Sequence, residues 1–135
     1  YLYIINFAPD RWPMGNPYNI TVDSAPNFKT LENDTFVTYG DLDASPTKAW
    51  LIERRNDEKW KWFYEYAFIK RRREELYVLA DDPDLLNNVG NNKKYAETKR
   101  KLHRQLMGRL KKARDPRVLG DGSTFDKPPY VVDLK

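Results

Sequence analysis

With 135 residues, 40% of them hydrophobic, the chain is long enough to bury a modest core as one globular domain, and its charged fraction of 33% fits such a domain. The absence of cysteine excludes a disulfide framework and a Cys-based metal site, and no apolar run approaches the roughly 20 residues of a membrane-spanning helix. The net charge is +4, and 18 of the 24 Lys and Arg residues fall in residues 54–114, which makes that half of the chain basic.

The first part of the sequence predicts one strand followed by a long loop. Residues 1–7 are rich in Tyr and Ile, which favour strands, and we expect the chain to start inside this strand, as a fragment of a longer protein would. Residues 8–44 hold four prolines among scattered Asn and Asp residues, which predicts a long irregular loop, with a short strand over residues 35–39 as an alternative.

Two helices are predicted next. Ser45 followed by Pro46 is a helix-start signal, because Ser caps a helix N-terminus and Pro fits the first helical position, and this helix would run to about residue 55. A second helix is predicted over residues 58–70, where aromatic residues recur at helical spacing on two stripes. A helix that is apolar on most sides is usually buried on most sides, so we expect either a central core helix or a contact with another domain or subunit.

A basic run, a strand and a turn signal follow. Residues 70–73 are four consecutive Lys and Arg residues, which would either pair with Glu74 and Glu75 or bind an anionic polymer. Residues 74–80 alternate in the period of a strand and are largely apolar on both faces, so we expect a strand that is covered on both sides. Asp82, which precedes a proline, predicts another helix start.

The last predicted helix covers residues 92–114. Leucines spaced along it lie on one face, whereas Lys and Arg residues fill the other, so the helix is amphipathic and we expect it to lie across a sheet. The only histidine, His103, has no second histidine or acidic cluster near it in the sequence, and no metal or catalytic role is expected for it. Residues 115–135 predict an extended tail, with a closing edge strand over residues 130–132.

Residues 75–89 resemble a signature that sulfatases carry near their C-terminus, in which a Glu-Leu-Tyr strand is followed by an Asp-Pro turn and two asparagines. The residues that carry this resemblance are Glu75, Leu76, Tyr77, Asp82, Pro83, Asn87 and Asn88. Val78 departs from the signature, which has Asp at that point of the strand.

The resemblance extends over nearly all of residues 1–135 and is strongest to the N-sulfoglucosamine sulfohydrolase branch, the heparan N-sulfatases. Further matching stretches are Arg11-Trp12-Pro13, Ser45-Pro46-Thr47, Trp62-Phe63-Tyr64 and Arg114-Asp115-Pro116. The resemblance implies an α+β fold, with a small antiparallel β-sheet and a long C-terminal amphipathic helix packed on it. It also implies a single C-terminal domain that docks against a large α/β catalytic domain.

The function implied by the resemblance belongs to the longer parent protein, which would hydrolyse sulfate esters or N-sulfates on a carbohydrate such as a glycosaminoglycan. The nearest match to the family's C/S-x-P-x-R motif, at residues 24–28, lacks the arginine, so we expect the fragment alone to be inactive and to scaffold the catalytic domain. The family's formylglycine and calcium ion would lie upstream, and no cofactor or metal is expected in the fragment itself. A periplasmic, secreted or lysosomal parent is implied.

The resemblance also implies four residues at the edge of the substrate pocket. Arg11 would pair with a sulfate or carboxylate, and Trp12 would stack on a sugar face. Asp41 and Asp43 would accept hydrogen bonds from sugar hydroxyls. The alternative for the first pair is that Trp12 packs under the loop and Arg11 forms a salt bridge.

A second functional class stays open, namely a non-catalytic basic module that binds nucleic acid or a sulfated polysaccharide. The basic half of the chain supports it, but the aromatic residues fall on helical stripes, where core packing explains them better than base stacking. Nucleic acid is therefore disfavoured as a partner. The expected partners are the upstream catalytic domain and a sulfated carbohydrate, with a homodimer left open and no membrane.

Overall fold

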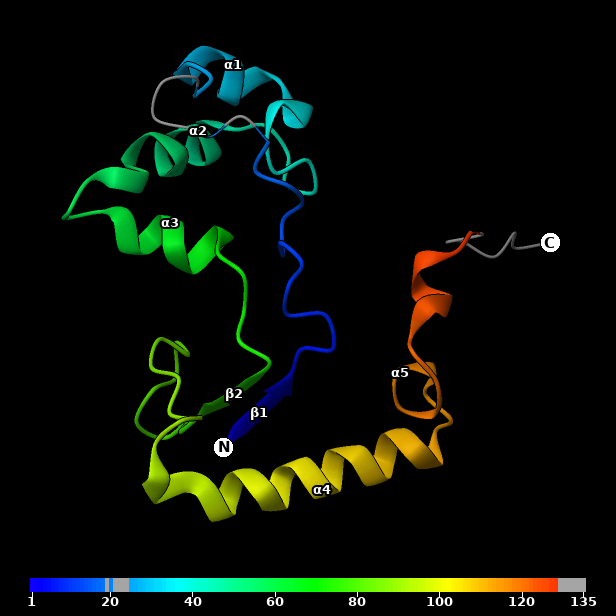
Figure 1. Cartoon of the computed structure of the whole chain (residues 1–135). Coiled ribbons are helices and arrows are strands. Elements are labelled where there is room, and N and C mark those ends of the chain that lie inside the picture. Colours follow the sequence, from blue (N-terminus) through cyan, green and yellow to red (C-terminus); the bar gives the residue numbers. More distant parts are fainter. Residues whose placement is uncertain (19, 21–24, 129–135) are drawn as a thin grey trace. The chain divides into compact units, whose positions relative to one another are not determined.

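The computed structural model describes residues 1–18, 20 and 25–128 (Figure 1). The chain folds into two compact units: unit 1 consists of Tyr1–Phe7 and Arg73–Lys135, and unit 2 consists of Ala8–Arg72. The single domain expected over residues 1–135 stays a prediction, and within the chain the structure distinguishes two compact units. The reason is that unit 2, which enters the sequence between the two strands of unit 1, encloses a hydrophobic core of its own.

Unit 1 is a two-stranded sheet with a long helix. Its elements are β1 (Leu2–Ile5), β2 (Glu74–Tyr77), the 3-10 turn η3 (Lys93–Tyr95), α4 (Ala96–Lys112), α5 (Pro116–Leu119) and the 3-10 turn η4 (Ser123–Asp126). β1 and β2 pair antiparallel, with Tyr3 opposite Leu76 and Ile5 opposite Glu74. The 17-residue helix α4 contacts β1 (Figure 1). The predicted α+β class with a small antiparallel sheet is confirmed.

β2 ends at Tyr77, three residues before the predicted strand end, because the carbonyl of Val78 accepts hydrogen bonds from the N–H groups of Asp81 and Asp82 and turns the chain. The helix start predicted at Asp82 is wrong. Its carboxylate accepts hydrogen bonds from the backbone N–H groups of Leu86 and Asn87, both at 2.9 Å, and so closes a loop. An Asp carboxylate that accepts backbone N–H groups can cap a helix or close a turn, and here it closes a turn.

The outer edge of β2 is covered by the end of this loop. The side-chain oxygen of Asn88 accepts hydrogen bonds from the N–H groups of Leu76, at 3.1 Å, and Gly90, at 2.9 Å, while Val89 donates its N–H to the carbonyl of Leu76. An added Cβ on Gly90 would lie 2.9 Å from that Asn88 oxygen, so the cap requires glycine. The backbone N–H and carbonyl of Leu76, which would otherwise lie open at the edge of the sheet, are therefore hydrogen-bonded.

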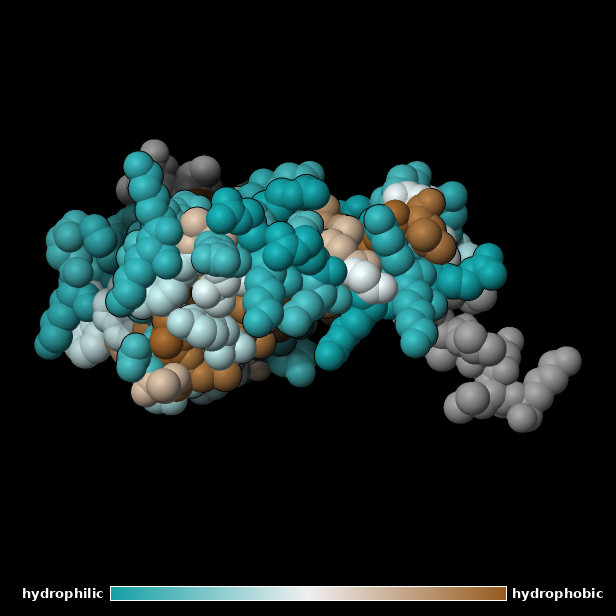
Figure 2. Space-filling model, turned by 90° about the horizontal axis from the view of Figure 1, so that it is seen from below, coloured by the Kyte–Doolittle hydropathy of each residue, from teal (hydrophilic) through white to brown (hydrophobic). Residues whose placement is uncertain are grey.

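Helix α4 begins at Ala96 instead of residue 92, because Asn92 caps a 3-10 turn by accepting the N–H of Lys94. Its apolar residues are half-buried, and none of its 17 residues is fully buried. Hydrophilic side chains dominate the surface on the side of α4 (Figure 2). The predicted amphipathic helix is therefore present, with only a shallow apolar face against the sheet.

The tail expected to be extended is partly helical. Asp115 starts α5 by accepting the N–H of Arg117, and the residue between them is a proline at the first helical position. η4 follows directly. The edge strand predicted over residues 130–132 lies outside the described residues.

Unit 2 is helical. Its elements are α1 (Phe28–Asn33), the 3-10 turn η1 (Thr35–Val37), α2 (Pro46–Glu53), the 3-10 turn η2 (Arg54–Asn56) and α3 (Lys61–Phe68). The irregular loop predicted over residues 8–44 thus contains a helix, whose cap Asn27 accepts the N–H of Thr30. The alternative strand over residues 35–39 is wrong, because the carboxylate of Asp34 accepts the N–H of Phe36 and starts a 3-10 turn.

The helix start at Ser45 and Pro46 is confirmed, since the Ser45 hydroxyl accepts the N–H of Lys48 at 3.2 Å. The buried core of unit 2 consists of Leu31, Tyr39, Ala49, Ile52 and Phe68. Only Phe68 of α3 is fully buried, whereas Trp62 and Tyr66 are 45% and 39% exposed. Within the described residues, α3 is therefore not the central core helix that was one of the two expectations.

The side chain of Lys48 is buried at the centre of unit 2. Its amino group donates three hydrogen bonds to backbone carbonyls, to Thr35 at 3.0 Å, Tyr39 at 3.1 Å and Leu42 at 2.7 Å. These bonds use all three donors of the ammonium group. Burial lowers the pKa of Lys48, and the nearby charges of acidic residues oppose that shift. The lysine ties the loop between α1 and α2 to α2.

We expect Lys48→Met to lower the free energy of unfolding of unit 2 by about 2–4 kcal/mol, because it removes three charge-assisted hydrogen bonds to backbone carbonyls inside the unit. All four tryptophans lie in unit 2, so tryptophan fluorescence during urea unfolding reports this unit alone. The control Lys29→Met, at an exposed position of α1, should be near neutral. Equal midpoints for the two variants would contradict the anchoring role of Lys48.

Gly108→Ala should raise the free energy of unfolding of unit 1 by about 0.5–1 kcal/mol, because glycine weakens a helix interior. Apart from its chain neighbours and the backbone of α4 itself, no atom lies within 4 Å of the added Cβ, so the methyl group meets no obstacle. Gly122→Ala is the control, since Gly122 has φ of +75° and its Cβ would lie 3.2 Å from the Arg117 side chain, and it should be destabilising. Urea unfolding followed by far-UV circular dichroism measures the stability of both variants. Stabilisation by Gly122→Ala as well as by Gly108→Ala would contradict the explanation from helix propensity and backbone conformation.

Candidate functional site

Two of the four predicted pocket residues share a hollow in unit 2. Arg11 and Trp12 line a hollow of about 350 Å³, together with Asp10, Gly15, Asn16 and Lys70. The Lys70 ammonium lies over the Trp12 ring, 5.0 Å from its centroid. The hollow therefore places two cations and the Asp10 carboxylate beside an aromatic ring.

Asp41 lines a neighbouring hollow of about 420 Å³, which shares Gly15 and Asn16 with the first. Backbone hydrogen bonds bring the two segments together, from Asp41 N–H to the Met14 carbonyl at 3.2 Å and from Tyr39 N–H to the Asn16 carbonyl at 2.9 Å. The close approach requires Gly15, which has φ of +85° and whose Cβ would lie 3.1 Å from a backbone nitrogen.

The structure does not bring Asp43 into either hollow. Its charge instead acts, with that of Asp34, to raise the pKa of Lys48 against the effect of burial. Trp12 is half-buried and also packs edge-on against Tyr39, with ring centroids 6.3 Å apart. Trp12 therefore both packs against the core and lines the hollow, so the alternative in which it only packs under the loop stays open.

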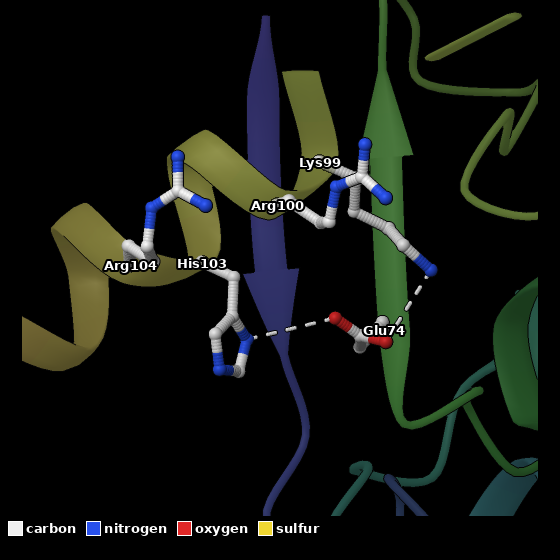
Figure 3. Close-up of a pocket in the computed structure, with 5 residues that line it drawn as sticks. All are labelled: Glu74, Lys99, Arg100, His103 and Arg104. Carbon is white, nitrogen blue, oxygen red and sulfur yellow. Dashed lines mark hydrogen bonds and ion pairs between the residues drawn. The ribbon is translucent and has the colours of Figure 1, made fainter. Parts of the chain in front are cut away.

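A polar network that the sequence reasoning missed lies between the sheet and α4 in unit 1. The Tyr3 hydroxyl donates to Oε1 of Glu74 at 2.5 Å and lies 2.9 Å from Nδ1 of His103. The Lys99 ammonium is 3.4 Å from Oε2 of the same carboxylate, and His103 Nδ1 is 3.6 Å from Oε1 (Figure 3). Since Tyr3 has one proton and gives it to Glu74, Nδ1 is the nitrogen that donates to Tyr3.

Sheet register and helix period together produce this network. Tyr3 and Glu74 fall on the same face of the antiparallel pair, because side chains alternate between faces and Tyr3 is opposite Leu76. Lys99 and His103 are one helical turn apart on α4. The alternation of side chains along a strand and the helical repeat of α4 can both be recognised in the sequence. The register that pairs Tyr3 with Glu74 cannot, because these residues are about seventy positions apart.

The electrostatics of the network are set by hydrogen bonding and burial. The hydrogen bond from Tyr3 lowers the pKa of Glu74, and the charges of Lys99 and His103 act in the same direction. Burial, with the Glu74 hydrogen bond, raises the pKa of the Tyr3 hydroxyl. The carboxylate therefore stays ionised and the phenol stays protonated over the neutral pH range, which leaves an acceptor group facing the surface of unit 1.

The described residues do not fit a calcium ion. Among them, no group of three or more His, Asp or Glu residues could hold a metal. Asp82, from the only tandem Asp pair, has both carboxylate oxygens bonded to backbone N–H groups. Over the same residues, no helix has the length and apolar character needed to cross a membrane.

A scan against protein-family models, a search of the curated proteins and a search of the solved structures each found no match to this chain. A functional assignment therefore rests on the residues and geometry described above.

Glu74→Gln should reduce the acid sensitivity of unit 1. Because the pKa of Glu74 lies below its ordinary value of 4.5 in the folded chain, its carboxylate contributes stability that is complete above that value. This contribution is lost as the pH falls through the lowered pKa. At about pH 6 the variant should therefore be less stable than the wild type by about 1 kcal/mol, and the difference should shrink at about pH 3.

Urea unfolding followed by far-UV circular dichroism at the two pH values measures this effect. Glu97→Gln is the control, since Glu97 is an exposed carboxylate of unit 1 on α4, and it should change stability by less than about 0.5 kcal/mol at either pH. A stability difference for Glu74→Gln that stays constant between the two pH values would contradict the linkage.

Proposed function

We propose that this chain is the C-terminal part of a sulfatase similar to the heparan N-sulfatases, whose parent hydrolyses sulfate esters or N-sulfates on a carbohydrate such as a glycosaminoglycan. The observation that carries the proposal is the order of residues in the run 75–89, followed by the long helix. In support, this run forms β2, a capped turn and an edge cap, and α4 contacts the sheet.

The residues of the run act as scaffold. The buried carboxylate of Glu75 accepts hydrogen bonds from the Asn6 amide at 3.0 Å and from the Tyr77 hydroxyl at 2.6 Å. Asp82 closes the turn and Asn88 caps β2. A buried carboxylate whose two oxygens both accept hydrogen bonds from neighbouring side chains holds the strands in place. These contacts favour a scaffolding role for the chain beside a catalytic domain.

The hollow of unit 2 would border the substrate pocket. Arg11 and Lys70 would hold a sulfate or carboxylate group, because two cations flank the hollow. Asp41, in the neighbouring hollow, would accept a hydrogen bond from a sugar hydroxyl. The nucleophile and calcium ion of the parent would come from residues upstream, and the exposed stripe of α3 would be covered by that catalytic domain.

In the parent protein, Arg11→Gln should raise KM for a sulfated disaccharide about tenfold, because a charge-assisted bond to the substrate is lost. The kcat for a small aryl sulfate, which does not reach the hollow, should change little. Lys29→Gln, an exposed charge removed from unit 2 outside both hollows, is the matched control.

Sulfate release by the parent and by the isolated 135-residue chain is measured in parallel, and only the parent should turn over substrate. An upstream sequence without a C/S-x-P-x-R motif, or a parent that releases no sulfate, would end the proposal. An unchanged KM in the Arg11 variant of an active parent would remove only the role given to the hollow.

A further inference from the structure

A third hollow, of about 300 Å³, lies on α4 in unit 1. It is lined by Glu74, Lys99, Arg100, His103 and Arg104 (Figure 3). We propose that this hollow and the adjoining face of α4 bind a sulfated sugar unit of a linear polysaccharide. The proposal does not depend on the sulfatase assignment, because it concerns binding by this chain alone.

Arg100 and Arg104 are the anion-binding groups. Both are exposed, they are one helical turn apart, and both guanidinium groups lie on the same side of α4 (Figure 3). Within the described part of the chain, neither guanidinium has an ion-pair or hydrogen-bond partner. Two unpaired guanidinium groups about 6 Å apart along the helix axis present ten N–H donors to a sulfate-bearing ligand.

The cationic row continues along the helix. Lys111 falls on the same stripe as Arg100 and Arg104 at 100° per residue, so the row extends for about 16 Å. The α4 sequence contains seven Lys and Arg residues and one acidic residue, Glu97. A row of this length suits a linear polyanion better than a single small ion, because each cation can meet a different anionic group.

Glu74 gives the hollow its preference for a sugar. Its carboxylate accepts hydrogen bonds from Tyr3 and Lys99, but a carboxylate has about four acceptor sites and this side chain is 32% exposed. Nε2 of His103 is turned away from Glu74 and offers a further polar contact (Figure 3). A sulfated sugar brings hydroxyl donors to such acceptors. The backbone of a DNA duplex has no hydroxyl donors along its length, so it meets the repulsion of the carboxylate without a hydrogen bond in return.

Single-stranded nucleic acid is disfavoured by a separate observation. Proteins that bind it combine basic grooves with aromatic side chains on which bases stack. The α4 sequence, Ala96–Lys112, contains no Phe, Tyr or Trp. The face therefore offers charge and hydroxyl recognition without a stacking surface.

The test titrates the 135-residue chain with three labelled polyanions of matched charge: a heparin-derived oligosaccharide, a DNA duplex and inorganic polyphosphate. The oligosaccharide should bind at least about tenfold more tightly than the other two. The double variant Arg100→Gln/Arg104→Gln should weaken oligosaccharide binding about 10- to 100-fold. The matched control Lys101→Gln/Lys112→Gln, which removes the same charge from another side of α4, should weaken it less than about threefold.

Circular dichroism checks that each variant keeps the fold. Glu74→Gln should narrow the preference for the oligosaccharide over polyphosphate, because the sugar hydroxyls lose their carboxylate acceptor whereas the relief of repulsion is the same for both polyanions. Equal losses in the two double variants would show a diffuse charge effect and overturn the site. If polyphosphate or DNA binds as tightly as the oligosaccharide, the recognition assigned to Glu74 is wrong. The same conclusion follows if the Glu74→Gln variant keeps the full preference for the oligosaccharide.

Discussion

The arrangement of unit 2 depends on one charged group taken out of water, the ammonium of Lys48. Its three bonds to the carbonyls of Thr35, Tyr39 and Leu42 fix a segment that belongs to no strand or α-helix. Tyr39 occupies the left-handed region with φ of +47°, which a tyrosine adopts only when its surroundings hold it there. The ring is held as well, by stacking on Phe68 at 4.4 Å and by a 2.6 Å hydrogen bond between its hydroxyl and that of Tyr64. Both hollows of this unit are built on the backbone pairing of that loop, so the position of Asp41 beside the Arg11 loop follows from a buried lysine.

Unit 1 is held together in part by a partly buried negative group, the carboxylate of Glu74. The apolar face of α4 is shallow, and the helix is held to the sheet in part through Glu74, which bonds to Tyr3 on β1 and to Lys99 on α4. Such partly buried, charge-assisted bonds are stronger than exposed ion pairs because less water competes for them. The same carboxylate also faces the hollow on α4, so a single residue serves the packing of the helix and the chemistry of the surface.

Short sequence patterns predicted the local structure, but they failed where one pattern is compatible with two structures. Ser45 before Pro46 and Asp82 before Pro83 are the same helix-start pattern, yet the first begins α2 and the second closes a loop. What separates them lies downstream, since only the first is followed by residues whose apolar side chains meet a core.

Arg11 and Trp12 were found from residue type and resemblance, and the structure brings them into one hollow. The network of Tyr3 with Glu74 and His103 was out of reach, because it joins residues 71 and 100 positions apart through a strand register that no local period specifies.

The run that resembles sulfatases and the residues suited to ligands are different sets, and physical chemistry explains the division. Glu75, Asp82 and Asn88 have their polar groups bonded within the fold, so their sequence pattern carries information about architecture. Ligand-binding groups must keep donors free in the folded state, as Arg100 and Arg104 do in the described part of the chain. Free surface cations contribute little to stability, so the fold places few limits on them. A resemblance built on the scaffold can therefore be close in chains that differ in what they bind, and the ligand must be argued from the unpaired groups of each surface.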